Sequence, residues 1–222
     1  MKKNHFADKD RAGFLCYNAG MRLKYPFRKE TVISRSRFIA CLAPAKDEEE
    51  ARAFIALIRK EFPDSTHVCT AFVTGENGEI QRSSDNGEPS GTAGMPMLEA
   101  IRHSGCEKTV AAVVRYFGGV KLGTGGLVRA YGGVVADALK EAPKVNDVPC
   151  SLYSVVYPYD LSGTIESYLR RTAEIMDLAY DEAVTCTFRT TEKNAPEQIR
   201  DLSRGQCEAE YLGEEFMEVN AD

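Results

Sequence analysis

Apolar residues in the first third of the chain follow strand-like runs and one helical stripe. Residues 30–44, ETVISRSRFIACLAP, read as two short strands or one bent strand that ends at a proline. Asp47 and the three glutamates after it predict the start of a helix that ends near Phe62. Residues 67–73 predict a further strand, and residues 76–79 predict a turn. This part of the chain therefore predicts mixed α and β structure.

A turn-rich segment comes next and leads into a second helix. Residues 85–91, DNGEPSG, are typical turn residues. Thr92 is placed to cap a helix that covers about residues 93–103, and Gly105 suits its C-terminal end. We therefore expect this segment to be a loop that ends at a capped helix.

The longest uninterrupted pattern is TVAAVVRYFGGVKLGTGGLVRAYGGVV, residues 109–135. Its apolar run at residues 110–114 predicts a buried strand, and an amphipathic helix is predicted from Leu127. Between them, residues 118–126 are dense in glycine. Each glycine costs roughly 0.5–1 kcal/mol in an ordered backbone. So many in one junction indicate positive φ angles or a close approach to the main chain, and we expect the functional surface here.

The last part of the chain reads strand, helix, strand, strand, helix, strand. The strands are predicted at residues 152–157, 177–180, 184–188 and 208–219, and the helices at residues 161–175 and 196–204. This order is the split βαβ, ferredoxin-like pattern. The polar stretch APKVNDVPC, residues 142–150, is the predicted connection between domains. The expected fold class is α+β in two domains, with an extension at residues 1–27 and domains at residues 28–146 and 147–222.

Composition indicates a soluble globular protein. Apolar residues make up 43% of the 222 residues and charged residues 27%. The N-terminus has no signal-peptide pattern, and no apolar run approaches the length of about 18 residues that spans a bilayer. We therefore expect a cytoplasmic protein without a membrane partner.

Cysteine and histidine positions do not indicate a metal site. The seven cysteines are widely scattered without a CxxC pair, and the three histidines form neither HxH nor HExxH. This spacing argues against a disulfide framework and against structural zinc. We expect buried, reduced cysteines, and neither a metal nor a cofactor.

Charge is unevenly divided along the chain. Residues 1–148 hold 22 Lys and Arg against 18 Asp and Glu, a net charge of +4. Residues 149–222 hold 6 Lys and Arg against 15 Asp and Glu, a net charge of −9. The acidic charge of the whole chain therefore does not exclude a polyanion-binding face on the N-terminal part, but it argues against indiscriminate nucleic-acid binding.

Two segments resemble a known family. SDNGEPSGTAGMPMLEAI and VVRYFGGVKLGTGGLVRAYGGVV closely resemble the signature segments of the IMPACT/YigZ family, a group of small cytoplasmic proteins. SRSRFIA, residues 34–40, resembles the family's entry strand. The resemblance covers about residue 30 to the end, and the ferredoxin-like tail fits the bacterial branch.

The resemblance implies a fold and a role. It implies an N-terminal α/β domain like one in a small-subunit ribosomal protein and the fourth domain of elongation factor G. The C-terminal domain resembles the ferredoxin-like domains of that factor. Eukaryotic family members regulate a starvation-responsive translation pathway through a protein partner. For bacterial members, RNA or ribosome binding is the usual proposal.

The glycine junction has three interpretations. In the first, its glycines permit tight packing between the strand and the helix. In the second, its amides at residues 121–127 hold a phosphate or sulfate anion together with Lys121 and Arg129. The third interpretation is an RNA surface, in which Arg115 and Lys121 interleave with aromatic residues such as Tyr116. A P-loop is excluded, because GxxxxGK[ST] is absent.

Two carboxylates in the turn-rich segment are weak catalytic candidates. Asp85 and Glu88 stand three positions apart, with the hydroxyls of Ser90 and Thr92 nearby. A turn followed by a capping threonine explains the same composition without chemistry. In the entry strand, Arg37 would extend a basic face if that strand lay beside the glycine junction.

The main hypothesis is a translation-associated regulatory protein without catalytic activity that binds RNA, the ribosome or a ribosome-linked partner. One alternative is a hydrolase or phosphotransferase that acts on a phosphorylated small molecule or nucleotide at the glycine loop. Another is a pure protein-interaction module. The expected binding residues are Arg37, Ser90, Thr92, Arg115, Tyr116, Gly118, Gly119, Lys121, Gly123, Thr124, Gly125, Gly126 and Arg129.

Overall fold

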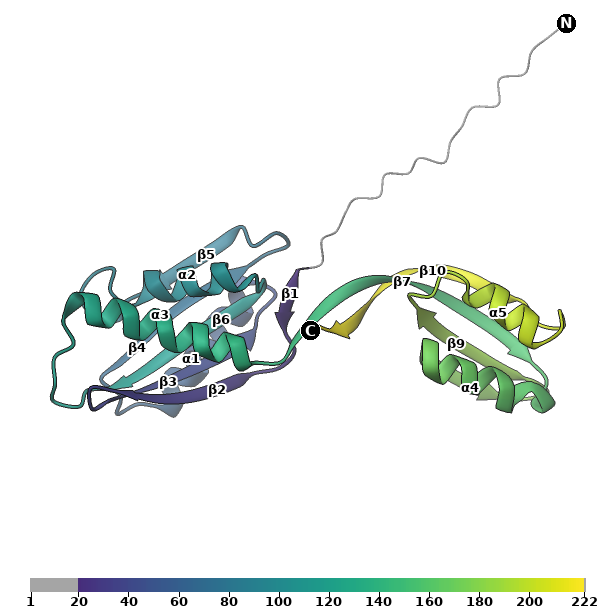
Figure 1. Ribbon diagram of the computed structural model, residues 1–222, viewed down its shortest axis with the longest axis horizontal. Helices are drawn as coiled ribbons and strands as arrows, with labels where there is room; N and C mark the ends of the chain where they lie inside the picture. Colours follow the sequence, from purple (N-terminus) through teal and green to yellow (C-terminus); the bar gives the residue numbers. More distant parts are fainter. Residues whose placement is uncertain (1–19, 222) are drawn as a thin grey trace, which may run out of the picture.

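The computed structural model describes residues 20–221, so most of the predicted extension at residues 1–27 lies outside the described residues. The described chain is an α+β protein with two antiparallel sheets (Figure 1). Within residues 20–221, no helix is long and apolar enough to cross a membrane.

The N-terminal unit is built on one five-stranded sheet. Its strand order is β2 (Phe27–Ile33), β3 (Ser36–Pro44), β6 (Thr109–Tyr116), β4 (His67–Thr74) and β5 (Ile80–Ser84). The segment at residues 30–44 is thus two strands, joined by a tight turn in which Ser34 and Arg35 have positive φ angles. Strand β5 lies at the sheet edge and had no clear signal in the sequence, since its exposed side chains are polar.

Helices cover both faces of this sheet. Helices α2 (Gly94–Ser104) and α3 (Gly123–Glu141) lie over one face and α1 (Glu48–Glu61) lies behind the other (Figure 1). Strand β6 is central, and residues 110–114 are buried on both sides. The continuous apolar run therefore reflects a strand that is packed on two faces.

Helix boundaries test the predicted caps. Asp47 caps α1 as expected, because its side chain accepts a hydrogen bond from the amide of Glu50. Gly105 ends α2 in the left-handed conformation, also as expected. The prediction that Thr92 caps α2 is wrong, since its hydroxyl donates to the carbonyl of Pro89 at 2.6 Å. Helix α3 begins at Gly123, one turn before the predicted Leu127.

The C-terminal unit confirms the predicted order of elements. After β7 (Lys144–Tyr157) come α4 (Ser162–Thr172), β8 (Glu174–Tyr180), β9 (Val184–Thr190), α5 (Ala195–Leu202) and β10 (Ala209–Asn220). The strand order is β10-β7-β9-β8, with antiparallel neighbours. The core is formed by α4 and α5 against one face, around Ile165, Leu169 and Phe188.

The two units are joined by a strand rather than by a polar linker. The predicted connection at residues 142–150 is mostly the first half of β7, despite Pro149. This half pairs on one edge with β1 (Met21–Leu23) and on the other with the end of β10. Figure 1 shows the chain returning to this junction at its C-terminal end. Strand pairing of this half of β7 with β1 and with β10 explains why a polar sequence is ordered here.

Candidate functional site

A pocket of about 410 Å³ lies at the start of α3, beside the β2–β3 turn. Its cationic groups are Lys121 and Arg129, both exposed. We call it the loop pocket; its lining is completed by Ile33, Ser34, Leu122, Gly126 and Ala130. Among residues 20–221, neither Lys121 nor Arg129 forms an ion pair with a carboxylate, so both charges face solvent.

The first turn of α3 lies beside this pocket, which Leu122 and Gly126 line. Leu122 occupies the N-cap position and makes no side-chain cap hydrogen bond. Helix α3 also has no acidic residue in its first turn. The N-terminal amides and the positive end of the helix dipole are therefore not neutralised by a cap or an acidic side chain. With Lys121 and Arg129 alongside, this arrangement favours an anion.

Close packing explains one glycine, and backbone conformation explains two others. A Cβ at Gly118 would lie 1.9 Å from the carbonyl oxygen of Arg35, so glycine is required there for packing. Gly119 and Gly123 have φ angles of +82° and +70°. These positions favour glycine because other residues rarely adopt such angles. Packing and an anion-binding loop are thus compatible interpretations of the same junction.

Most exposed members of the predicted set gather at this loop. Besides Lys121 and Arg129, the exposed residues at the loop are Gly119, Gly123, Thr124 and Gly125, whereas Gly118 and Gly126 are partly buried. Two further exposed members of the set, Arg37 and Ser90, lie elsewhere.

Arg37 and Tyr116 lie on the other face of the sheet. They are cross-strand neighbours, and Tyr116 packs with the cluster beneath α1. The Arg37 guanidinium stacks 5.3 Å from the Tyr116 ring centroid and pairs with Glu30 at 2.9 Å. The expectation that Arg37 extends the basic face of the glycine junction is wrong, because strand alternation directs it to the opposite side.

Arg115 does not belong to an exposed surface. It is 4% exposed, and its Nη1 donates to Glu88 Oε1 at 2.5 Å. Its Nη2 donates to the Ser36 hydroxyl at 3.2 Å. The guanidinium also lies 5.3 Å from the ring centroid of Phe38 and 5.6 Å from that of Phe117. Arg115 is therefore a buried structural cation. Its side chain is not accessible for the contact to RNA that the sequence predicted.

Glu88 joins the two signature segments. Besides Arg115, it accepts a hydrogen bond from the Tyr131 hydroxyl at 2.7 Å, which reaches it from α3. Burial, with Cys69 and Glu88 nearby, raises the pKa of Tyr131 and keeps the hydroxyl a donor. His67 Nε2 lies 3.9 Å from the same carboxylate oxygen. Sequence reasoning missed Tyr131 and His67, because the first sits in an apolar helical stripe and the second belongs to no motif.

Asp85 fixes the start of α2. Its carboxylate accepts hydrogen bonds from the amides of Gly91, Ala93 and Gly94, at 2.8–2.9 Å. Burial acts to raise the pKa of Asp85, but these three amides outweigh it and hold the pKa below its usual range. Both weak catalytic candidates are thus occupied by protein donors. Of the neighbouring hydroxyl residues, Thr92 is buried and Ser90 is exposed.

Replacing Asp85 with asparagine is expected to destabilise the N-terminal unit in a pH-dependent way. A carboxylate whose pKa is lowered on folding contributes stability above its unfolded pKa of about 4. That contribution is lost as the pH falls through the lowered folded value. The melting temperature of Asp85→Asn should therefore lie below that of the parent at pH 7 and approach it below pH 4. A constant difference across this range would contradict the assignment.

Metal-ligating groups do not cluster in the described chain. Within residues 20–221, no three His, Cys, Asp or Glu side chains are placed to share a metal ion. The six cysteines described there are free and buried, whereas Cys16 lies outside the described residues. Burial raises the pKa of Cys69 to about 12 and that of Cys41 to about 11. These two thiols are therefore protonated and unreactive at neutral pH.

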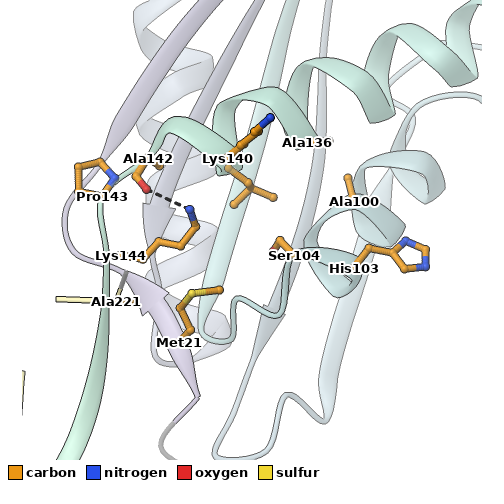
Figure 2. Close-up of a pocket in the computed structure, with 11 residues that line it drawn as sticks. Met21, Ala100, His103, Ser104, Ala136, Lys140, Ala142, Pro143, Lys144 and Ala221 are labelled. Atoms are coloured by element: carbon orange, nitrogen blue, oxygen red, sulfur yellow. Dashed lines mark hydrogen bonds between the residues drawn. The ribbon is translucent and has the colours of Figure 1, made fainter. Parts of the chain in front are cut away.

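A larger pocket, of about 640 Å³, lies where α2 and α3 end against β1 and β7. Its walls are mainly apolar, and Lys144 donates to the carbonyl of Ala142 at 3.2 Å. Figure 2 shows the Lys140 ammonium and the His103 ring pointing away from Lys144. The basic groups here do not converge on one point.

Comparison with known proteins gives consistent matches. A model of the Impact N-terminal domain matches residues 34–139. IMPACT family member YvyE of Bacillus subtilis is 40% identical over 183 residues, which cover 81% of this chain and 84% of the relative. IMPACT family member YigZ of Escherichia coli is 38% identical over 182 residues, which cover 79% of this chain and 89% of the relative. A crystal structure of a hypothetical protein is 34% identical, with a TM-score of 0.56, and covers 87% of this chain and 97% of that one.

Proposed function

The chain belongs to the IMPACT family, and on that premise we propose that it is a translation-associated regulatory protein that binds RNA or the ribosome. The contact surface is the loop pocket and the exposed glycine loop around it. The observation that carries the proposal is the uncapped start of α3 between Lys121 and Arg129. Amides, a helix dipole and two unpaired cations together provide a site for backbone phosphates.

Charge distribution supports the choice of surface. The N-terminal part of the chain carries the net positive charge, and residues 149–222 carry a net charge of −9. A polyanion is attracted to the first part and repelled by the second. The N-terminal unit is therefore the RNA-facing part in this proposal, and the acidic unit lies away from the polyanion.

The family resemblance also supports a finer description of the fold. In this proposal, the N-terminal unit corresponds to the α/β domain of a small-subunit ribosomal protein and of elongation factor G. The antiparallel order β10-β7-β9-β8 supports a ferredoxin-like C-terminal unit. Domains of these kinds occur in proteins that work on the ribosome, which agrees with the proposed partner.

Replacing Lys121 and Arg129 together with alanine is expected to weaken ribosome association and reduce its salt dependence. Two lost phosphate contacts should reduce the slope of log K against log salt by about 1.5–2. Co-sedimentation of the full chain with ribosomes over a series of salt concentrations measures both effects. A matched control is Lys60→Ala with Lys140→Ala, which removes two exposed cations away from the loop pocket.

Two outcomes would reject this function. One is a parent protein that does not co-sediment with ribosomes at low salt. The other is a Lys121/Arg129 variant that behaves like the Lys60/Lys140 control. Capture of a protein partner that persists after RNase treatment, with no ribosome association, would instead identify an interaction module.

A further inference from the structure

A second basic pocket lies on the opposite face of the N-terminal sheet, where α1 meets β4 and β5. It has a volume of about 550 Å³, which falls in the range of small-molecule sites. Its apolar contacts are Ile55 and Ala56 of α1 and Phe72 of β4. The site is thus separated from the loop pocket by the sheet itself.

Three arginines line this second pocket, which we call the arginine pocket. Arg52 and Arg59 stand seven residues apart on α1, so they lie on one side of the helix and about 10 Å apart along its axis. Arg82 projects from β5, directly across from Phe72 of β4. Because cross-strand partners share a face of the sheet, Arg82 faces α1. Cations therefore stand on both walls.

These arginines carry more positive charge than the surrounding protein neutralises. Arg52 is paired with Glu48, and Arg82 donates to the carbonyl of Gln81 at 2.9 Å. Arg59 makes no hydrogen bond or ion pair within the described residues 20–221. The lining contains no carboxylate. Two of the three charges are thus left without a counter-charge.

Hydroxyl groups add uncharged donors to the same pocket. Thr70 and Ser84 are directly opposite each other on β4 and β5, and both line it. Guanidinium groups are donors only, and hydroxyls also donate. An oxyanion with several acceptor oxygens is the ligand that such a set of groups satisfies.

We propose that the arginine pocket binds the phosphate group of a small organic phosphomonoester. Such a group carries a charge of about −1.5 to −2 at pH 7. This charge matches the two unneutralised arginines, whereas a phosphodiester, with a single charge, leaves one of them unpaired. The phosphate lies between Arg59 and Arg82, and the organic part contacts Ile55 and Phe72.

Calorimetric titration of the full chain tests the site, with adenosine 5′-monophosphate as the probe and inorganic phosphate as a second ligand. Arg59→Gln and Arg82→Gln should each weaken binding at least about tenfold, since each removes a charge-assisted hydrogen bond. Lys60→Gln is the control. It removes the same charge from the neighbouring position of α1, which does not line the pocket.

A third titration separates the two sources of phosphate. An oligoribonucleotide without terminal phosphates presents only phosphodiesters and should not compete with adenosine 5′-monophosphate. Competition that depends on Arg59 would overturn the proposal in favour of RNA. No binding of either small ligand at millimolar concentration, or equal weakening by Arg59→Gln and Lys60→Gln, would also overturn it.

Two controls complete the design. The melting temperatures of the arginine variants without ligand should match that of the parent, because Arg59 and Arg82 are exposed. The Lys121/Arg129 variant should bind adenosine 5′-monophosphate as the parent does. Loss of that binding would assign the phosphate to the loop pocket and overturn the proposal, whether or not ribosome association persists.

Discussion

Replacing Glu88 with glutamine is expected to reduce the free energy of unfolding of the N-terminal unit by about 3–5 kcal/mol. The carboxylate is buried and pairs with Arg115 at 2.5 Å, and both side chains are about 5% exposed or less. Glutamine keeps the size and an acceptor for the Tyr131 hydroxyl. It removes the counter-charge, so a buried guanidinium is left uncompensated.

The arrangement around Arg115 makes this loss severe. Its Nε is buried and already has no hydrogen-bond partner in the described chain. The Ser36 hydroxyl is neutral and cannot replace the charge of Glu88. The two flanking rings, Phe38 and Phe117, contribute only cation–π contacts. The carboxylate is therefore the main partner of this cation.

Urea denaturation measures the effect, with hydrogen exchange of the β6 amides identifying the transition of the N-terminal unit. Glu30→Gln is the control, since it breaks the exposed ion pair with Arg37 and should change stability little. If Glu88→Gln is as stable as Glu30→Gln, then Arg115 is not held by Glu88 in solution.

Replacing Gly118 with alanine is expected to destabilise the N-terminal unit by about 3 kcal/mol or more. The new Cβ would lie 1.9 Å from the carbonyl oxygen of Arg35 and 2.6 Å from the amide nitrogen of Ser36. Both atoms are main chain, so no side-chain rotation relieves the contact. The β2–β3 turn must move away, which also breaks the hydrogen bond from the Gly118 amide to the Ser36 hydroxyl.

A second glycine of the same signature provides the matched control. Gly133 lies within α3, and a Cβ there would have no neighbour within 4 Å. Gly133→Ala should therefore stabilise the chain by roughly 0.5–1 kcal/mol, the usual gain of alanine over glycine in a helix. Thermal melts of the two variants should move in opposite directions. If the melting temperature of Gly118→Ala equals that of the parent, then the β2–β3 turn moves without loss of stability and the prediction is wrong.

Local signals predicted the elements well. Asp47 is followed by the acidic first turn that it caps, and the apolar run at residues 110–114 is the central strand. The order of the last six elements followed from periodicity alone. The resemblance to the IMPACT family rested on two signature segments, and the relatives confirm it. Each of these predictions depends on residues that are close in sequence.

The misassigned residues depend on distant partners. Arg115 directly follows the apolar run at residues 110–114 within β6, but only the fold brings Glu88 and Ser36 against it. Thr92 has a good cap sequence, yet Asp85 reaches the same amides from seven residues earlier. The arginine pocket was missed for the same reason, because α1 and β5 are separate in sequence and each reads as a solvated surface.

The strand β7 also affects how the molecule is assembled during synthesis. Its partners in β10 are 54 to 75 residues further along the chain. The start of β7 pairs with β1 on one edge, and its other edge stays unpaired until residues 209–220 have been synthesised. Contacts of this separation form late and slowly compared with local ones. The junction between the two units is therefore completed by the last strand to be synthesised, so its completion depends on translation of β10.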